Sequence, residues 1–406
     1  MKTKINGTNG KIISLATSLG VCLALYICLV SSLTAALLIL ALGLGLIIYG
    51  ERKDSIEQVY LSVEKNKPIV LGIIVLFVLV LPFLLHKNNY LLHVVVMAGI
   101  YAIVALGLNF QVGSTGMVNF APAALFGAGA YVSAIAAVKF GISPWLGILL
   151  GMVGAALLGL IFGFPALKTR GYYLSLVTIA LQIIFTQMIV NTAWLGGPNG
   201  IPGIPPYELA GFSFKQSLKI LGLTIPYQIN YIYLTFIFLG LTALAASRLY
   251  TSRTGLAWNA IEQDEIVAAT QGINLTKEKL LAFALGAAFA GVAGALYAHY
   301  TSFIGYEDFD FSKSLILICM VLLGGMDNVS GVTLGAILLT IIDEKLRDFA
   351  DYRMLMYSVI LITILITRSQ GLLPKRTRKY KEKSTGMPCV GQTVTMGGES
   401  SGSLKN

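Results

Sequence analysis

The sequence predicts an all-α polytopic membrane protein, and three observations lead to this fold class. Of the 406 residues, 56% are hydrophobic and 12% are charged, and the mean hydropathy is +0.78. Soluble proteins carry about 25% charged residues, so too little polar surface is left here to cover a globule in water. The apolar residues also form continuous runs rather than the alternating pattern of a membrane β-barrel. A soluble multidomain enzyme is therefore excluded.

Transmembrane helices are expected wherever about 20 consecutive residues are predominantly apolar. In chain order, the predicted spans are 12–30, 33–50, 69–85, 91–112, 118–139, 144–166, 172–192, 229–247, 279–300, 309–325, 329–344 and 352–367. Several of these runs are short, so we expect about 10–12 transmembrane helices. Glycines spaced four residues apart predict close crossings between helices. These pairs are Gly147/Gly151, Gly159/Gly163 and Gly331/Gly335.

The net charge of +10 does not indicate a nucleic-acid partner. The positions of the basic residues instead indicate how the chain is oriented in the membrane lipid. With the amino terminus in the cytoplasm, 21 of the 29 Lys and Arg residues fall on the cytoplasmic side, including all those of the tail from Arg368 to Lys405. This distribution follows the positive-inside rule. Both termini are therefore predicted to be cytoplasmic. The first apolar run has no clear cleavage site, so we expect it to remain as a span or signal anchor.

The residue types that common catalytic sites need are missing or scattered. The four cysteines form neither a disulfide framework nor a zinc motif. The three histidines, His86, His93 and His299, are too far apart for a metal or catalytic cluster and are expected to be structural. No G-x-x-x-x-G-K-S/T phosphate loop occurs, so this chain does not hydrolyse ATP by itself. We expect no catalytic residue, no metal and no cofactor.

The predicted spans contain almost no ionisable side chains. Asp310 and Lys313 lie at one outer boundary, and Asp343 and Glu344 at another. Proton-coupled carriers and voltage sensors generally keep a titrating or moving charge deep in the membrane. Its absence argues against a proton-coupled carrier, whereas a sodium site made of carbonyl and hydroxyl groups stays open.

Residues 107–131, GLNFQVGSTGMVNFAPAALFGAGAY, predict a helix that breaks near 113–122 and restarts at Pro122. Unwound backbone at membrane depth is tolerated only where it is buried in protein or lines a cavity. The N–H groups of the restarting helix would favour a substrate carboxylate. The candidate substrate-pathway residues are Asn109, Gln111, Gly113, Ser114, Thr115, Gly116 and Asn119. The alternative is a kinked helix whose small residues only allow close packing.

The cytoplasmic segment 253–279 is the second candidate functional element. Residues Ala257–Thr270 predict a short helix, and Gly272 is placed as its left-handed cap. Small apolar residues lie along one side, and an acidic patch is formed by Glu262, Asp264 and Glu265. Such a helix suits a groove on a cytoplasmic partner. By composition alone, a solvated loop with ordinary helix content is the favoured explanation.

Four segments together resemble the permease subunits of bacterial branched-chain amino acid ABC transporters, the LivM type. They are residues 107–131, the Gly196–Gly200 loop, residues 253–296 and Val321–Gly335. The resemblance covers roughly 91–370. It implies a partnership with a second, homologous permease, two cytoplasmic ATP-binding subunits and a periplasmic substrate-binding protein. It also implies that Ala257–Gly272 is the coupling helix, which favours partner docking over a solvated loop. The coupling residues are then Ala260, Glu262, Asp264, Glu265, Ala268, Ala269 and Gly272.

The chain departs from the family pattern at two places. Glu262-Gln263 stands where Arg-Glu is expected, so the contact with the ATPase is charged differently. Residues 116–122, GMVNFAP, are more similar to the second permease of such transporters, and Pro122 replaces a usual His. The choice between the two permease types and the exact substrate therefore stay open.

We accordingly expect three parts: an N-terminal membrane extension (1–90) of about three spans with a cytoplasmic loop at 51–68, a permease core (91–370), and a basic, then disordered, cytoplasmic tail (371–406). The expected function is import of branched-chain or other neutral amino acids across the bacterial inner membrane by alternating access. A urea or short-amide ABC permease is the alternative within this class. An ion-coupled secondary amino acid carrier is the alternative from another class.

Overall fold

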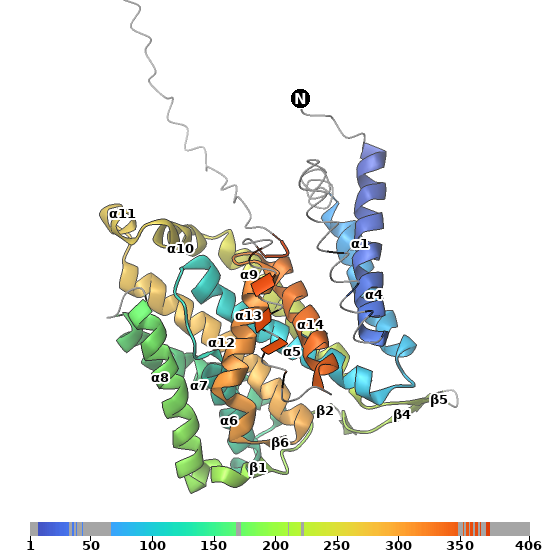
Figure 1. Cartoon of the computed structure of the whole chain (residues 1–406). Helices are drawn as coiled ribbons and strands as arrows, with labels where there is room; N and C mark the ends of the chain where they lie inside the picture. The colour runs from blue at the N-terminus through green and yellow to red at the C-terminus, as the bar shows by residue number, and fades with distance from the viewer. Residues whose placement is uncertain are drawn as a thin grey trace, which may run out of the picture. The chain divides into compact units, whose positions relative to one another are not determined.

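The computed structural model describes residues 7–31, 66–167, 172–209, 211–220, 223–347 and 371–373, with isolated positions between 35 and 43 and between 352 and 366. The fold is all-α, as predicted, and Figure 1 shows the helices. The long ones are α5 (Asn89–Asn109), α6 (Pro122–Phe140), α7 (Pro144–Leu167), α8 (Tyr172–Asn191), α9 (Gln228–Tyr250) and α12 (Leu275–Thr301). The others are α1 (Gly7–Val30), α4 (Lys67–Leu84), α10 (Arg253–Gln263), α11 (Glu265–Thr270), α13 (Phe311–Gly324) and α14 (Val329–Lys345).

Within the described residues, six helices are long and apolar enough to cross a membrane. The first of these spans combines α5 with the turn that follows it and ends at Ser114. The apolar parts of α1 and α4 are shorter. Ten of the twelve predicted spans coincide with a helix to within a few residues. The predicted spans 33–50 and 352–367, most of the loop 51–68 and nearly all of the tail 371–406 lie outside the described residues. The total of 10–12 spans and the three-part division therefore stay predictions.

Helix α5 is the central element of the fold. Of its most apolar stretch, 94% is buried, against 39% for α7 and 28% for α8. It packs against α9, α12, α13 and α14. A helix that is apolar all round is stable only when it is surrounded, whereas the exposed apolar faces of α7 and α8 suit lipid or a partner helix. The broken helix at the end of α5 is therefore held inside protein.

Glycine allows α6, α7 and α12 to cross at backbone distance. A Cβ atom on Gly151 would lie 2.8 Å from the carbonyl oxygen of Gly129, and one on Gly291 would lie 2.5 Å from the carbonyl oxygen of Gly151. A Cβ on Gly159 would lie 2.5 Å from that of Ala287. The close crossings that the glycine spacing predicts are thus confirmed at these positions. Without side chains in the way, van der Waals packing can hold the helices together in lipid.

The end of the molecule opposite α10 and α11 carries short antiparallel strand pairs (Figure 1). The pairs are β1 (Ile201–Pro202) with β6 (Phe303–Ile304), β2 (Glu208–Leu209) with β3 (Phe212–Ser213), and β4 (Leu218–Ile220) with β5 (Leu223–Ile225). His299 ties this loop region to α6. Its Nδ1 lies 2.6 Å from the carbonyl oxygen of Pro205 and its Nε2 lies 2.9 Å from Ser133 Oγ. Because a carbonyl only accepts, Nδ1 carries the proton and the neutral ring accepts from Ser133. This is a structural histidine, as expected.

The N-terminal helices attach to the rest of the described chain through a few polar contacts. Asn66 Nδ2 donates to Ser14 Oγ over 3.0 Å, which joins the start of α4 to α1. Tyr233 of α9 donates to the carbonyl oxygen of Leu79 over 3.0 Å, and Lys345 donates to that of Ser31 over 2.7 Å. Helices α1 and α4 therefore lie against α14 and α9, beside the bundle that surrounds α5.

Candidate functional site

The predicted break in the helix is present, and its geometry begins with a π-helical turn. Helix α5 continues into this turn at Phe110–Ser114, the chain then loses helical structure, and α6 restarts with Pro122 in its first turn. Gly116 lies in the break with φ of +68°, a conformation that favours glycine. Proline is tolerated in a first turn because its missing N–H would have no partner there. Such π-turns are frequent at functional sites.

Two amide side chains bridge the break. Asn119 Nδ2 donates to Gln111 Oε1 over 2.6 Å, and Asn119 Oδ1 accepts from the backbone N–H of Ala121 over 2.8 Å. Gln111 Nε2 donates in turn to the carbonyl oxygen of Phe283 in α12, over 3.3 Å. The two chain segments on either side of the break are therefore fixed to each other and to α12.

A buried carboxylate that the sequence analysis did not select joins the same region. Asp327 lies in the turn between α13 and α14 with φ of +62° and is 3% exposed. Ser114 Oγ donates to Asp327 Oδ1 over 2.8 Å, and the Asp327 N–H donates to Asn109 Oδ1 over 2.9 Å. Asn109 Nδ2 donates to the Tyr250 hydroxyl over 2.6 Å. The network thus connects the break with α9, α13 and α14.

The first N–H groups of α6 are bonded to protein side chains. The N–H of Ala123 donates to Ser314 Oγ over 3.1 Å, and that of Ala124 donates to Gln182 Oε1 over 2.8 Å. Just before the helix, the N–H of Phe120 donates to Thr178 Oγ1 over 3.0 Å. The sequence analysis assigned the N–H groups at the start of α6 to a substrate carboxylate. In this conformation, side chains of α8 and α13 accept their hydrogen bonds instead.

The candidate pathway residues lie together, and most of them are fully packed. Asn109, Ser114 and Asn119 have 0% exposure, Gln111 has 1% and Thr115 has 2%. Gly113 is also buried, whereas Gly116 is exposed. Because every one of the five polar side chains bonds within the protein, the break is closed here.

The predicted coupling helix is two helices instead of one. Asp264 separates α10 from α11, and its Oδ1 accepts from the N–H groups of Ile266 and Val267 over 2.8 and 3.1 Å. Aspartate is a strong N-cap because its carboxylate satisfies the first free N–H groups of a helix. That interaction starts a new helix and ends the previous one. Gly272, with φ of +81°, then follows the end of α11 as predicted.

Helix α10 is anchored to the membrane bundle by Trp258, a second residue that was missed. Trp258 is 0% exposed, and its Nε1 donates to the carbonyl oxygen of Glu278 over 3.1 Å. Its ring lies 5.6 Å from that of Phe110, the first residue of the π-turn. Phe110 also contacts Tyr250 and Phe289. Helix α10 and the broken helix are therefore in direct contact.

The remaining coupling residues divide into an anchored and an exposed set. Ala268 is buried, Ala260 is half-buried, and Glu265 forms a 2.6 Å ion pair with Lys279 at the start of α12. The exposed members are Glu262, Asp264, Ala269 and Gly272. Beside them, Ile266 and Val267 are 72% and 55% exposed. A Cβ on Gly116 would lie 3.6 Å from Glu262 Cγ, so the break and α10 are neighbours.

Comparison with known proteins identifies the family of the chain. The family described as the permease component of branched-chain amino acid transport systems matches residues 90–367, which is more than half of the chain. The chain belongs to this family. It is therefore a multi-pass membrane permease, as the sequence resemblance implies. No solved structure matches the chain.

Individual relatives carry the same description. The high-affinity branched-chain amino acid transport permease LivM of Salmonella typhimurium is 35% identical over 337 residues, which cover 80% of this chain and 78% of that protein. LivM of Escherichia coli is 34% identical over 336 residues, which again cover 80% of this chain and 78% of that protein. The high-affinity branched-chain amino acid transport permease LivH of Escherichia coli is 26% identical over 293 residues, covering 69% of this chain and 92% of that protein. The chain is thus more similar to these LivM proteins than to this LivH protein.

Proposed function

We propose that this chain is the LivM-type half of an ABC importer for branched-chain or other neutral amino acids. The observation that carries the proposal is the direct packing of the cytoplasmic helix α10, through Trp258, on Phe110 at the broken helix. A permease driven by separate ATPases needs a cytoplasmic element that can move a gate in the membrane. In this chain the two elements touch. The names of the relatives support the substrate class.

The proposed assembly contains a second permease, two cytoplasmic ATP-binding subunits and a substrate-binding protein outside. ATP is bound by the partner subunits, and this chain needs no cofactor of its own. The excess of Lys and Arg in the segments between spans on one side supports a bacterial inner-membrane location with both termini cytoplasmic. The permease core 91–370 would be flanked by the extension 1–90 and the tail 371–406.

The proposed gate is the hydrogen-bonded break itself. When the ATPases close on α10 and α11, the Trp258–Phe110 contact would pull on the π-turn. Side chains such as Asn119 and Ser114 would then exchange their protein partners, Gln111 Oε1 and Asp327 Oδ1, for substrate groups. Amides and hydroxyls can bond both ends of a zwitterion. Such a gate would discriminate little among neutral amino acids, which leaves selectivity mainly to the binding protein.

Co-purification tests the assignment. The tagged chain is extracted from its native membrane in mild detergent, and the bound proteins are identified. Recovery of a second permease and ATP-binding subunits supports the ABC importer. Recovery of the chain alone, together with amino acid uptake on an ion gradient without ATP, would identify an ion-coupled carrier and refute the proposal. Uptake of urea or short amides in place of amino acids would keep the assembly and change the substrate.

A further inference from the structure

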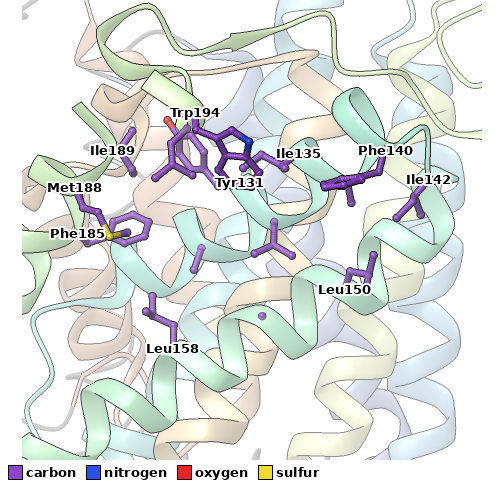
Figure 2. Close-up of a pocket in the computed structure, with 15 residues that line it drawn as sticks. Tyr131, Ile135, Phe140, Ile142, Leu150, Leu158, Phe185, Met188, Ile189 and Trp194 are labelled. Atoms are coloured by element: carbon purple, nitrogen blue, oxygen red, sulfur yellow. The ribbon is translucent and has the colours of Figure 1, made fainter. Parts of the chain in front are cut away.

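An apolar cavity lies apart from the broken helix, between α6, α7 and α8. It has a volume of about 430 Å³ and is partly open (Figure 2). Trp194 and Leu195, in the turn Ala193–Leu195 that follows α8, are among the lining residues. Its wall includes Tyr131, Leu158, Phe185, Met188 and Trp194. The sequence analysis selected none of these residues, and the proposed transport cycle does not use them.

The chemistry of the wall favours a hydrocarbon occupant. Almost all of the accessible lining is apolar. The hydroxyl of Tyr131 is itself buried and has no hydrogen-bond partner among the residues that the structure describes. The charged groups of an amino acid would lose their hydration here without gaining partners, which costs several kcal/mol. An acyl chain has no such groups and gains contact with the wall.

The part of the cavity wall at Trp194 has the features of a membrane interface. Trp194 lies in its wall, and tryptophan is enriched where hydrocarbon meets headgroups. Lys139, in the last turn of α6, is exposed, and its Nζ lies 4.5 Å from the centre of the Trp194 ring. The same ammonium donates to the carbonyl oxygen of Trp194. Because an ammonium has three donors, it can also bind a phosphate from the adjacent leaflet.

We propose that this cavity binds one acyl chain of an anionic phospholipid whose phosphate lies at Lys139. The site rests on the membrane location of the chain and does not depend on the transported substrate. The bound chain would fix the spacing of α6 and α8. These are the helices joined at the break by Gln182 and Ala124. The lipid would therefore stabilise the closed form of the gate.

A matched pair of variants on one helix tests the cavity. Leu158→Trp fills it, whereas Leu157→Trp, at an adjacent residue that is 55% exposed, changes only the lipid-facing surface. The assembled protein in mild detergent is melted with and without added phosphatidylglycerol. We expect the lipid to raise the Tm of the native protein and of Leu157→Trp, and to leave the Tm of Leu158→Trp unchanged. An equal rise in both variants would overturn the proposal.

The headgroup contact has its own control. Lys139→Gln should reduce the response to phosphatidylglycerol to that seen with phosphatidylcholine, whereas Lys87→Gln, an exposed lysine on another hairpin, should not. If Leu158→Trp does not fold, photo-crosslinking of the native complex decides. A phosphatidylglycerol with a diazirine in its acyl chain should label cavity residues such as Met188 more strongly than it labels residues of similar exposure on the apolar surface outside the cavity. Equal labelling of residues inside and outside the cavity would show that lipid covers this face without a specific site. Labelling of the isolated chain that disappears in the full complex would show that the second permease covers this face. Either result would refute the proposal.

Discussion

Replacement of Asn119 by alanine tests whether the broken helix is held by its side-chain network. The substitution removes the 2.6 Å hydrogen bond to Gln111 and leaves the N–H of Ala121, a residue 1% exposed, without its side-chain acceptor. A buried donor left unpaired costs about 1–3 kcal/mol, and a hydrogen bond between side chains in membrane proteins contributes about 0.6 kcal/mol on average. The expected loss in the free energy of unfolding is therefore about 2–4 kcal/mol.

The assay is a double-mutant cycle of Asn119→Ala with Gln111→Ala, in which the free energy of unfolding is measured by SDS titration in lipid–detergent micelles. We expect a coupling energy of about 0.6–1.7 kcal/mol. Thr186→Ala is the matched control, since the Thr186 hydroxyl donates to the carbonyl oxygen of Gln182 in its own helix. It should change stability little. A coupling energy of zero would refute the bridge across the break. In the reconstituted complex, alanine variants of Ser114, Thr115 and Asn119 that all kept normal uptake would remove the proposed pathway.

Three further predictions concern the coupling element and the helix crossings. Trp258→Ala should leave ATP hydrolysis in the complex but lower uptake per ATP, whereas Trp258→Phe, which keeps a ring against Phe110, should retain most of the uptake. Equal defects would show that only the indole hydrogen bond matters. Glu265→Gln should cost less than about 1 kcal/mol of stability, because the pair with Lys279 is partly solvated, and the charge exchange Glu265→Lys with Lys279→Glu should restore what is lost. Gly291→Leu should prevent stable folding by separating α7 from α12, while Gly240→Ala, with open space around it, should fold with a normal Tm.

Hydropathy was sufficient for most of the helices, since a span needs only a long apolar run. The break was also predictable, because Gly116 has a positive φ in the break and Pro122 suits the first turn of a new helix. The side chains that accept hydrogen bonds from the first N–H groups of the restarting helix could not be predicted from the sequence. Ser314 and Gln182 come from distant parts of the chain and meet Ala123 and Ala124 only in the folded bundle.

Two other features illustrate the same limit. The split between α10 and α11 had a local signal, because Asp264 before Glu265 and Ile266 is an N-cap pattern, but good helix formers on both sides suggested one helix. Asp327 had the signal of an acidic residue in a glycine-containing turn between two apolar runs. Its burial against Ser114 depends on the packing of α13 and α14 beside α5. Local pattern thus predicted the elements, and tertiary packing selected their partners.

The most direct test of the proposed function is uptake of a labelled branched-chain amino acid by proteoliposomes. They contain this chain with the permease and ATP-binding subunits that purify with it. The substrate-loaded binding protein is supplied outside and ATP inside. We expect uptake that requires ATP, the binding protein and every subunit. Uptake by this chain alone on an ion gradient, unchanged when ATP is removed, would contradict it.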